Sequence, residues 1–244
     1  MAKTGLLAKF AFFIGLIAAV ALPVGALGHR VRLWDHMMGL TLVFSGTVLA
    51  VLALVLGAAA FIFALTRKRP ADRVPALVGV VAGVLVLGWM AVQYNKAISV
   101  VPTHDISTDV VDPPAFDVLV ERRPPGSNSL VFTDEEAAMQ VEGYPDVATI
   151  VSSGEVEGDL ARATDIARAL GWEIANEDAG LGIVEAVDTT FWFGFKDDIV
   201  IRVRSTDDGS VVDLRSVSRV GLVDLGVNAE RIREFRRRWA SATD

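Results

Sequence analysis

Three long runs without a charged side chain constrain this 244-residue chain more than any other feature. They cover residues 10–27, 37–65 and 75–92, and Pro23 interrupts only the first. Each run is close to or above the roughly 20 apolar residues that a helix needs to cross a hydrocarbon core about 30 Å thick. Uncharged runs of this length are rare in soluble proteins. Residues 1–96 are therefore predicted to form a membrane region with three transmembrane helices.

Charge divides the chain at the same place. Residues 1–96 contain nine Lys and Arg and two Asp, whereas residues 97–244 contain 14 Lys and Arg and 28 Asp and Glu. The second part, about 148 residues long, is large enough for one domain with its own core. Its negative charge would repel phosphates, which argues against nucleic acid as a partner. The chain contains no Cys, so a disulfide, a thiol nucleophile and a Cys-based metal site are all excluded.

The basic residues that flank the apolar runs predict how the chain crosses the membrane. Lys and Arg are enriched on the cytoplasmic side of membrane proteins. One side would have Arg30, Arg32 and Lys96, and the other would have Lys3, Lys9, Arg67, Lys68, Arg69 and Arg73. This asymmetry predicts a multi-pass protein with a cytoplasmic N-terminus and the acidic domain outside. A signal peptide cleaved near Gly28 is the alternative for the first run, and it leaves the same orientation.

Two glycines four residues apart, Gly79 and Gly83, lie in the third run. Small residues at this spacing let two helices approach closely. They predict either packing among the three helices of one chain or a homodimer through Gly79 and Gly83, in both cases within the lipid bilayer. No Asp, Glu, Lys, Arg or His lies within the three runs, so a charge-dependent transport pathway has no residues to use.

Residues 97–132 are predicted to form an extended linker, because their five prolines exclude a long helix. Residues 133–244 are predicted to form a globular domain. Its expected elements are a weak helix from Thr133 or Asp134, a helix at 160–170 with Asp159 as N-cap, strands at 172–176, 182–190, 199–205 and 210–220, and a helix at 228–239. This order predicts an α+β fold, with an antiparallel four-stranded sheet covered by helices on one face.

The dipeptide Asp208-Gly209 is typical of a two-residue hairpin turn and predicts how the last two strands pair. The resulting register places Arg204 opposite Asp213 and Arg202 opposite Arg215. One face would carry these charged residues, and the other would carry Ile199, Ile201, Val203, Val212 and Leu214. Two like charges directly opposite each other are unfavourable. The arginines therefore require either internal carboxylates, such as Asp213 and Glu185, or an external anion.

Residues 221–228, which lead into the last helix, present the same two alternatives, internal pairing or an external anion. Their glycines, Asp224 and Asn228 suit a capped turn, but a helix N-terminus beside Arg219 and Arg231 is also a usual anion site. Anion binding is therefore one hypothesis, and a polar face that is solvated or paired internally is the other. The residues proposed for binding are Arg202, Asp213, Arg215, Ser218, Arg219, Asp224, Asn228 and Arg231.

Four stretches of the second part resemble a bacterial family, the domain of unknown function 1499. They are HDISTD (104–109), DPPAF (112–116), FGFKDDIVIRV (193–203) and VDLRSVSRVGLVDLGVNAERI (212–232), and the resemblance covers about residues 102–239. Members of the family are associated with the membrane or the cell envelope and have no established activity. The resemblance implies that residues 97–244 form one family domain. The orientation predicted from the basic residues makes this domain periplasmic and attached to the inner membrane. It also marks further polar residues for testing, among them His104, Asp105, Asp109, Asp197, Asp198 and Ser216.

Few residues in the second part are suited to catalysis. His104 is its only histidine, and the nucleophile motif G-x-S-x-G is absent. His104, Asp105 and Asp109 match no familiar metal-site spacing, so neither a metal nor a cofactor is predicted. Asp197 and Asp198 are adjacent on a strand and would point to opposite faces. The favoured hypothesis is a non-catalytic envelope module that binds a protein or a small anionic ligand. The alternative is a membrane-surface hydrolase that uses His104 and nearby acids.

Overall fold

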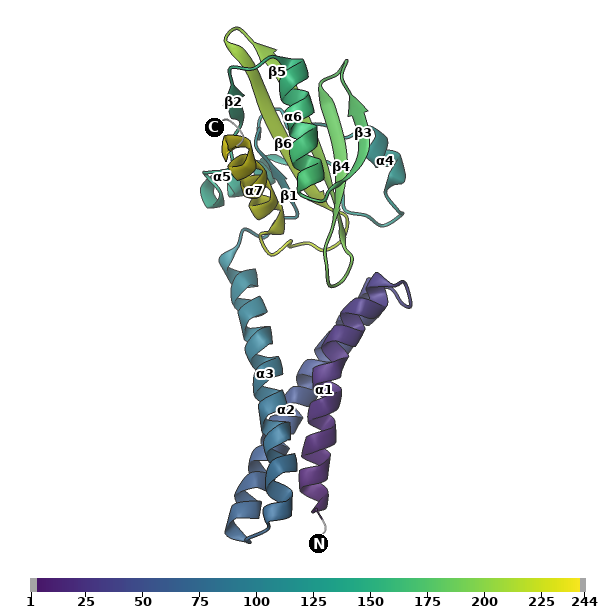
Figure 1. The fold of residues 1–244 in the computed structure, drawn as a ribbon, viewed down its shortest axis with the longest axis vertical. Coiled ribbons are helices and arrows are strands. Elements are labelled where there is room, and N and C mark those ends of the chain that lie inside the picture. Colours follow the sequence, from purple (N-terminus) through teal and green to yellow (C-terminus); the bar gives the residue numbers. More distant parts are fainter. Residues whose placement is uncertain (1–3, 242–244) are drawn as a thin grey trace. The chain divides into compact units, whose positions relative to one another are not determined.

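The computed structural model describes residues 4–241 of the chain (Figure 1). The chain divides into two compact units. The helical unit consists of residues up to 95 together with 191–194, and the sheet unit consists of residues 96–190 and those from 195 onward. Lys3, one of the basic residues that predict the orientation, lies outside the described residues.

Each apolar run forms one long helix: α1 Leu6–Arg30, α2 His36–Thr66 and α3 Pro70–Ser99. All three helices are long and apolar enough to cross a membrane, which confirms the three helices predicted from hydropathy. Pro23 lies inside α1 without ending it. α2 begins after Asp35, whose carboxylate accepts a 2.8 Å hydrogen bond from the backbone N–H of Met38.

The three helices pack on one another through small residues. A Cβ added to Gly79 would lie 2.7 Å from the backbone oxygen of Ala11 in α1. One added to Gly83 would lie 2.8 Å from the backbone oxygen of Ala50 in α2. Because no side chain fits at either position, the two glycines permit close helix contacts. The structure uses both for packing within one chain, and a homodimer through them stays a prediction.

The sheet unit contains one antiparallel sheet of six strands, in the order β1-β6-β5-β4-β3, with β2 also paired to β6. The strands are β1 Asp105–Ser107, β2 Ile150–Ser152, β3 Glu173–Asp178, β4 Ile183–Thr189, β5 Lys196–Thr206 and β6 Gly209–Ser218. β3 to β6 correspond to the four predicted strands, and the α+β fold is confirmed. β1 and β2 are short additions along β6, and β1 comes from the segment that was predicted to be a linker.

Four helices accompany the sheet: α4 Val118–Arg122, α5 Asp134–Gly143, α6 Val156–Ala169 and α7 Val227–Ser241. α5 begins as predicted, because Thr133 and Glu136 form a capping box. α6 begins after Glu155, earlier than predicted, so the prediction of Asp159 as N-cap is wrong. Asp159 lies in the first turn of α6 and accepts a 2.6 Å hydrogen bond from the hydroxyl of Ser210 on β6.

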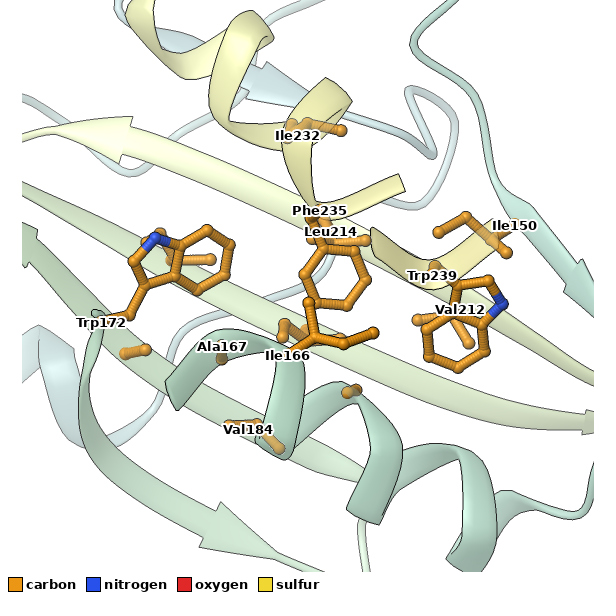
Figure 2. Packing of buried hydrophobic residues seen from close by; sticks show 14 of the residues in the cluster. Ile150, Ile166, Ala167, Trp172, Val184, Val212, Leu214, Ile232, Phe235 and Trp239 are labelled. Atoms are coloured by element: carbon orange, nitrogen blue, oxygen red, sulfur yellow. The ribbon is translucent and has the colours of Figure 1, made fainter. Parts of the chain in front are cut away.

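The helices α6 and α7 cover one face of the sheet and bury the hydrophobic core against it (Figure 2). The apolar strand residues that alternation places on one face, Ile199, Ile201, Val203, Val212 and Leu214, all lie in this core, as predicted. Figure 2 shows Phe235 of α7 between two tryptophans. Its ring centroid lies 5.9 Å from that of Trp172 and 6.0 Å from that of Trp239. These stacked rings pack α7 onto the sheet.

The β5–β6 hairpin has a different register from the predicted one. Its two-residue turn is Asp207-Asp208, and Gly209 pairs with Thr206 at the start of β6. Arg202 therefore lies opposite Asp213, and Arg215 lies opposite Val200. The predicted Arg202–Arg215 pair is wrong. The shift amounts to two residues, so every side chain keeps its predicted face.

Candidate functional site

The polar face is the side of β5 and β6 that points away from the hydrophobic core. It carries Asp198, Arg202, Arg204, Asp213 and Arg215, and most of these side chains are buried. Since Arg202 lies opposite Asp213, the like-charge pair that would have required relief by an external anion does not exist. Backbone and side-chain groups from residues 105–132, together with Asp213, bind the arginines of this face instead.

Arg215 is held by partners from three directions. Its Nε and Nη2 donate to the two carboxylate oxygens of Asp105 on β1, at 3.0 Å and 2.6 Å. It also donates to the backbone oxygens of Pro114, at 3.3 Å, and Leu130, at 2.7 Å. Its guanidinium lies 5.6 Å from the ring of Phe116 and 5.5 Å from the ring of Phe132. Arg215 is only 4% exposed. Through these contacts it holds residues 97–132, here called the proline-rich segment, on β6.

Asp198 binds two arginines at the end of the polar face. Arg219 donates to its carboxylate from Nε, at 2.9 Å, and from Nη2, at 2.6 Å. Arg123, which directly follows α4, donates to the other carboxylate oxygen, and its Nη2 reaches the backbone oxygen of Asn128 at 2.7 Å. The Asn128 side chain in turn donates to the backbone of Ser218, at 2.9 Å. This cluster fastens the second half of the proline-rich segment to the sheet.

Arg202 and Arg204 share three carboxylates. Arg204 donates to Asp213 at 2.9 Å, to Asp109 at 2.9 Å and to Asp112 at 3.1 Å, and Arg202 binds the same three residues. Partial burial disfavours the charged form of Asp109. Hydrogen bonds from the backbone N–H groups of Asp112 and Val111, and the nearby Arg204, outweigh this effect and lower the pKa of Asp109. With three carboxylates around two arginines, the cluster has no unbalanced positive charge to attract an anion.

Arg231 of α7 forms a cluster on the helix side of the sheet. Its Nη2 donates to Asp188 at 2.8 Å and to Asp197 at 2.6 Å, and its Nη1 donates to the hydroxyl of Ser216 at 3.0 Å. Asn228 also accepts from Arg231 and donates to the hydroxyl of Ser218 at 3.0 Å. Asp197 thus points to the helix side, whereas Asp198 points to the polar face, as their adjacent positions predict.

The turn before α7 is capped within the chain. The two carboxylate oxygens of Asp224 accept hydrogen bonds from the backbone N–H groups of Gly226 and Asn228, both at 2.8 Å. Burial raises the pKa of Asp224 and outweighs these two hydrogen bonds, which lower it. Each of the eight residues proposed for binding therefore has a partner inside the sheet unit.

His104 directly precedes β1, and its backbone carbonyl binds β6 and α7. Its carbonyl oxygen accepts from the N–H of Ser218, at 2.9 Å, and from the side chain of Asn228, at 3.0 Å. Its two neighbouring acids, Asp105 and Asp109, bind Arg215 and Arg204 respectively. Within residues 4–241, no group of three or more His, Asp or Glu side chains could hold a metal ion. The HDISTD stretch thus positions arginines of the polar face and ties β1 to β6.

The sequence analysis did not predict that Glu185 caps the helix α4. Its side chain is fully buried on β4, and its carboxylate accepts from the backbone N–H groups of Asp117, at 2.9 Å, Val118, at 2.9 Å, and Leu119, at 3.2 Å. These donors belong to the start of α4, so Glu185 caps this helix from another element. A lone acid within the apolar run of residues 182–187 was the signal that pointed to a buried, fully paired carboxylate.

A groove of about 430 Å³ opens beside α7, and sequence analysis missed it as well. It is lined by Leu170, Trp172, Asp188, Val227, Glu230, Arg231, Glu234 and Arg237. At its rim, Arg237 binds Glu230 at 2.6 Å and Glu234 at 2.8 Å. The residues that form the groove come from the ends of α6 and β4 and from α7. No local sequence pattern therefore predicts the groove.

The geometry can be compared with known families. A family model described as "Protein of unknown function (DUF1499)" matches residues 105–238. The chain belongs to the DUF1499 family. The DUF1499 match begins at β1 and extends into α7, so it contains all six strands and leaves α1 to α3 outside. It confirms the resemblance drawn from the sequence. No curated protein matches the chain.

Proposed function

We propose that this DUF1499 protein is a non-catalytic interaction module of the cell envelope, attached to the inner membrane by α1 to α3. The observation that carries this proposal is the internal pairing of the polar residues in the family region. Arg215, Arg219 and Arg231 are buried and bound to Asp105, Asp198 and Asp197. Because these side chains are already bound inside the domain, they are not available as an acid–base pair or as an anion site.

The excess of basic residues at one end of the helices supports a cytoplasmic N-terminus and an extracytoplasmic sheet unit. The backbone N–H of Gly5 donates to the Asp72 carboxylate at 2.6 Å, so α1 and α3 begin at the same end of the helical unit. Lys9, Arg67, Lys68, Arg69 and Arg73 all lie in the segments near this end. By the positive-inside rule, this end faces the cytoplasm.

The groove beside α7 is the surface that we assign to partner binding. Its apolar lining comes from Leu170, Trp172 and Val227. A small anion would have to displace the carboxylates already bound to Arg231. An apolar segment of an envelope protein meets no such obstacle, and Val227, which is exposed, offers it an apolar contact. The groove therefore favours a protein over an anionic ligand.

The orientation can be tested by accessibility, because the chain contains no Cys. We expect a membrane-impermeant maleimide to label Asp208→Cys, in the exposed β5–β6 turn, in intact spheroplasts. Thr66→Cys, at the end of α2, should be labelled only after lysis. The opposite pattern, with Thr66→Cys labelled in intact spheroplasts and Asp208→Cys protected, would contradict the proposed orientation.

The binding role can be tested with a photo-crosslinking amino acid placed at Leu170 in the full-length protein in living cells. We expect a discrete protein adduct, and we expect Val227→Asp, which places a charge in the same groove, to remove it. The matched control is the same amino acid at Leu181, an exposed leucine in the β3–β4 turn. Adducts that form equally at both positions, or that persist in Val227→Asp, would refute the groove as the binding surface.

A further inference from the structure

Two loops of the chain expose large apolar side chains. The β4–β5 loop, residues 190–195, carries Phe191 and Trp192, which are 69% and 55% exposed. The β6–α7 loop, residues 219–226, carries Leu222, which is 81% exposed, and Leu225. Among the described residues after α3, Phe191 and Trp192 are the only exposed aromatic side chains. Exposed aromatic residues of this kind usually mark an interaction surface.

Both loops leave the sheet at the same end. The last β4–β5 pair before the first loop is Thr189 with Lys196. Arg219, which starts the second loop, donates from its backbone N–H to the Lys196 carbonyl at 3.0 Å. Thr189, Lys196 and Arg219 therefore form one row across the end of the sheet. Figure 1 shows that the connection from β4 to β5 and the connection from β6 to α7 both lie at this end of the strands.

The chain from α3 arrives at this same end. The His104 carbonyl accepts from the N–H of Ser218, and the Thr103 carbonyl accepts from the N–H of Asp224 at 3.1 Å. α3 ends at Ser99 and β1 begins at Asp105. At most about 20 Å of extended chain can separate the two elements. The chain that leaves α3 therefore enters the sheet, through β1, at the end from which both loops leave it.

Aromatic residues locate the membrane surface on α3 itself. Trp89 and Tyr94 are exposed near its C-terminal end, and Lys96 follows them. Trp and Tyr gather at the headgroup level of membranes, where an apolar ring with a polar group is best accommodated. Along the chain, only the last few residues of α3 and the short connection to β1 then separate that level from the sheet.

We propose that the two loops insert their apolar side chains into the headgroup region of the bilayer and anchor the sheet unit to the lipid surface. Charge favours the same assignment. Residues 97–244 contain twice as many acidic as basic residues, 28 against 14, and would be repelled by anionic lipids. Residues 189–195, by contrast, carry no charge. Residues 189–195 thus offer the bilayer an uncharged surface, and the β6–α7 loop is uncharged apart from Arg219, whose side chain binds Asp198, and Asp224, whose carboxylate caps the turn before α7. The proposal depends on neither the orientation nor the groove.

The test uses the full-length chain in vesicles of phosphatidylcholine and phosphatidylglycerol. An environment-sensitive fluorophore is attached at Leu222→Cys or Trp192→Cys, and at Asp208→Cys in the β5–β6 turn as the control. We expect spin labels near the lipid headgroups to quench most of the fluorescence at the two loop positions and little at Asp208→Cys. Quenching at the loops no greater than at the control would overturn the proposal. So would a blue-shifted emission without quenching by lipid, because the loops would then pack against protein.

A second variant tests the contribution of the aromatic loop. Phe191→Ser with Trp192→Ser should reduce lipid quenching of a probe at Leu222→Cys, since one of the two anchors is lost. The urea midpoint, followed by the fluorescence of the buried Trp172 and Trp239, should stay unchanged because both substituted side chains are exposed. Unchanged quenching, or a loss of quenching accompanied by unfolding, would refute an anchoring role for this loop.

Discussion

Replacing Arg215 with leucine should lower the free energy of unfolding of the sheet unit by about 3–5 kcal/mol, the usual effect of removing one partner of a buried ion pair. The reason is the carboxylate left behind. Asp105 is 1% exposed, and Arg215 is the partner that binds both of its oxygens. The substitution also frees the backbone oxygens of Pro114 and Leu130 and removes the cation between Phe116 and Phe132. The proline-rich segment should then detach from β6.

The measurement is the urea midpoint of the full-length chain in detergent micelles, followed by the fluorescence of the buried Trp172 and Trp239. Asp105→Leu combined with Arg215→Leu should recover much of the loss, because no buried charge then remains unpaired. Arg168→Leu is the matched control, since Arg168 is exposed and its surface ion pairs contribute little. If Arg215→Leu were no more destabilising than Arg168→Leu, the clamp would have no structural importance.

The face of each strand residue could be predicted from the sequence, whereas the register could not. Alternation along residues 199–205 and 210–220 separates apolar from charged side chains, and a shift of two residues leaves that separation intact. The sequence offers both Asp207-Asp208 and Asp208-Gly209 as turns. A tertiary contact distinguishes them: Gly209 has a φ of 140°, and a Cβ on it would lie 2.3 Å from the backbone oxygen of Ser152. That close approach of β2 is invisible in a local pattern.

The proline-rich segment covers the polar face, and this arrangement shows a second limit of sequence reasoning. Charged side chains at every second position indicate that a strand has a polar side, but they do not say whether water or protein lies on it. Here the answer depends on pairs far apart in the chain, such as Asp105 with Arg215. The prolines of residues 97–132 correctly excluded a long helix, yet they gave no sign that the segment lies on the sheet. The three apolar helices were easier to predict, because length and composition alone define them.

Replacing Glu185 with leucine should destabilise the sheet unit by about 3 kcal/mol or more, because each buried donor left without an acceptor costs about 1–3 kcal/mol. One carboxylate accepts from three consecutive N–H groups at the start of α4. It also complements the positive end of the helix dipole. α4 has only five residues, so it has little stability of its own without this cap. Glu185→Gln should have a smaller effect, because one amide oxygen remains as an acceptor.

Hydrogen exchange of the full-length chain, followed by mass spectrometry of peptides covering residues 117–122, gives a local measure of the same effect. In Glu185→Leu these amides should exchange faster, and faster than in Glu173→Leu, whose side chain is exposed on the neighbouring strand β3. Equal exchange of α4 in the two variants would show that its own turn or water satisfies the three donors. Acceleration in Glu185→Leu alone would establish that a buried acid of the central sheet holds the proline-rich cover in place through a helix N-terminus.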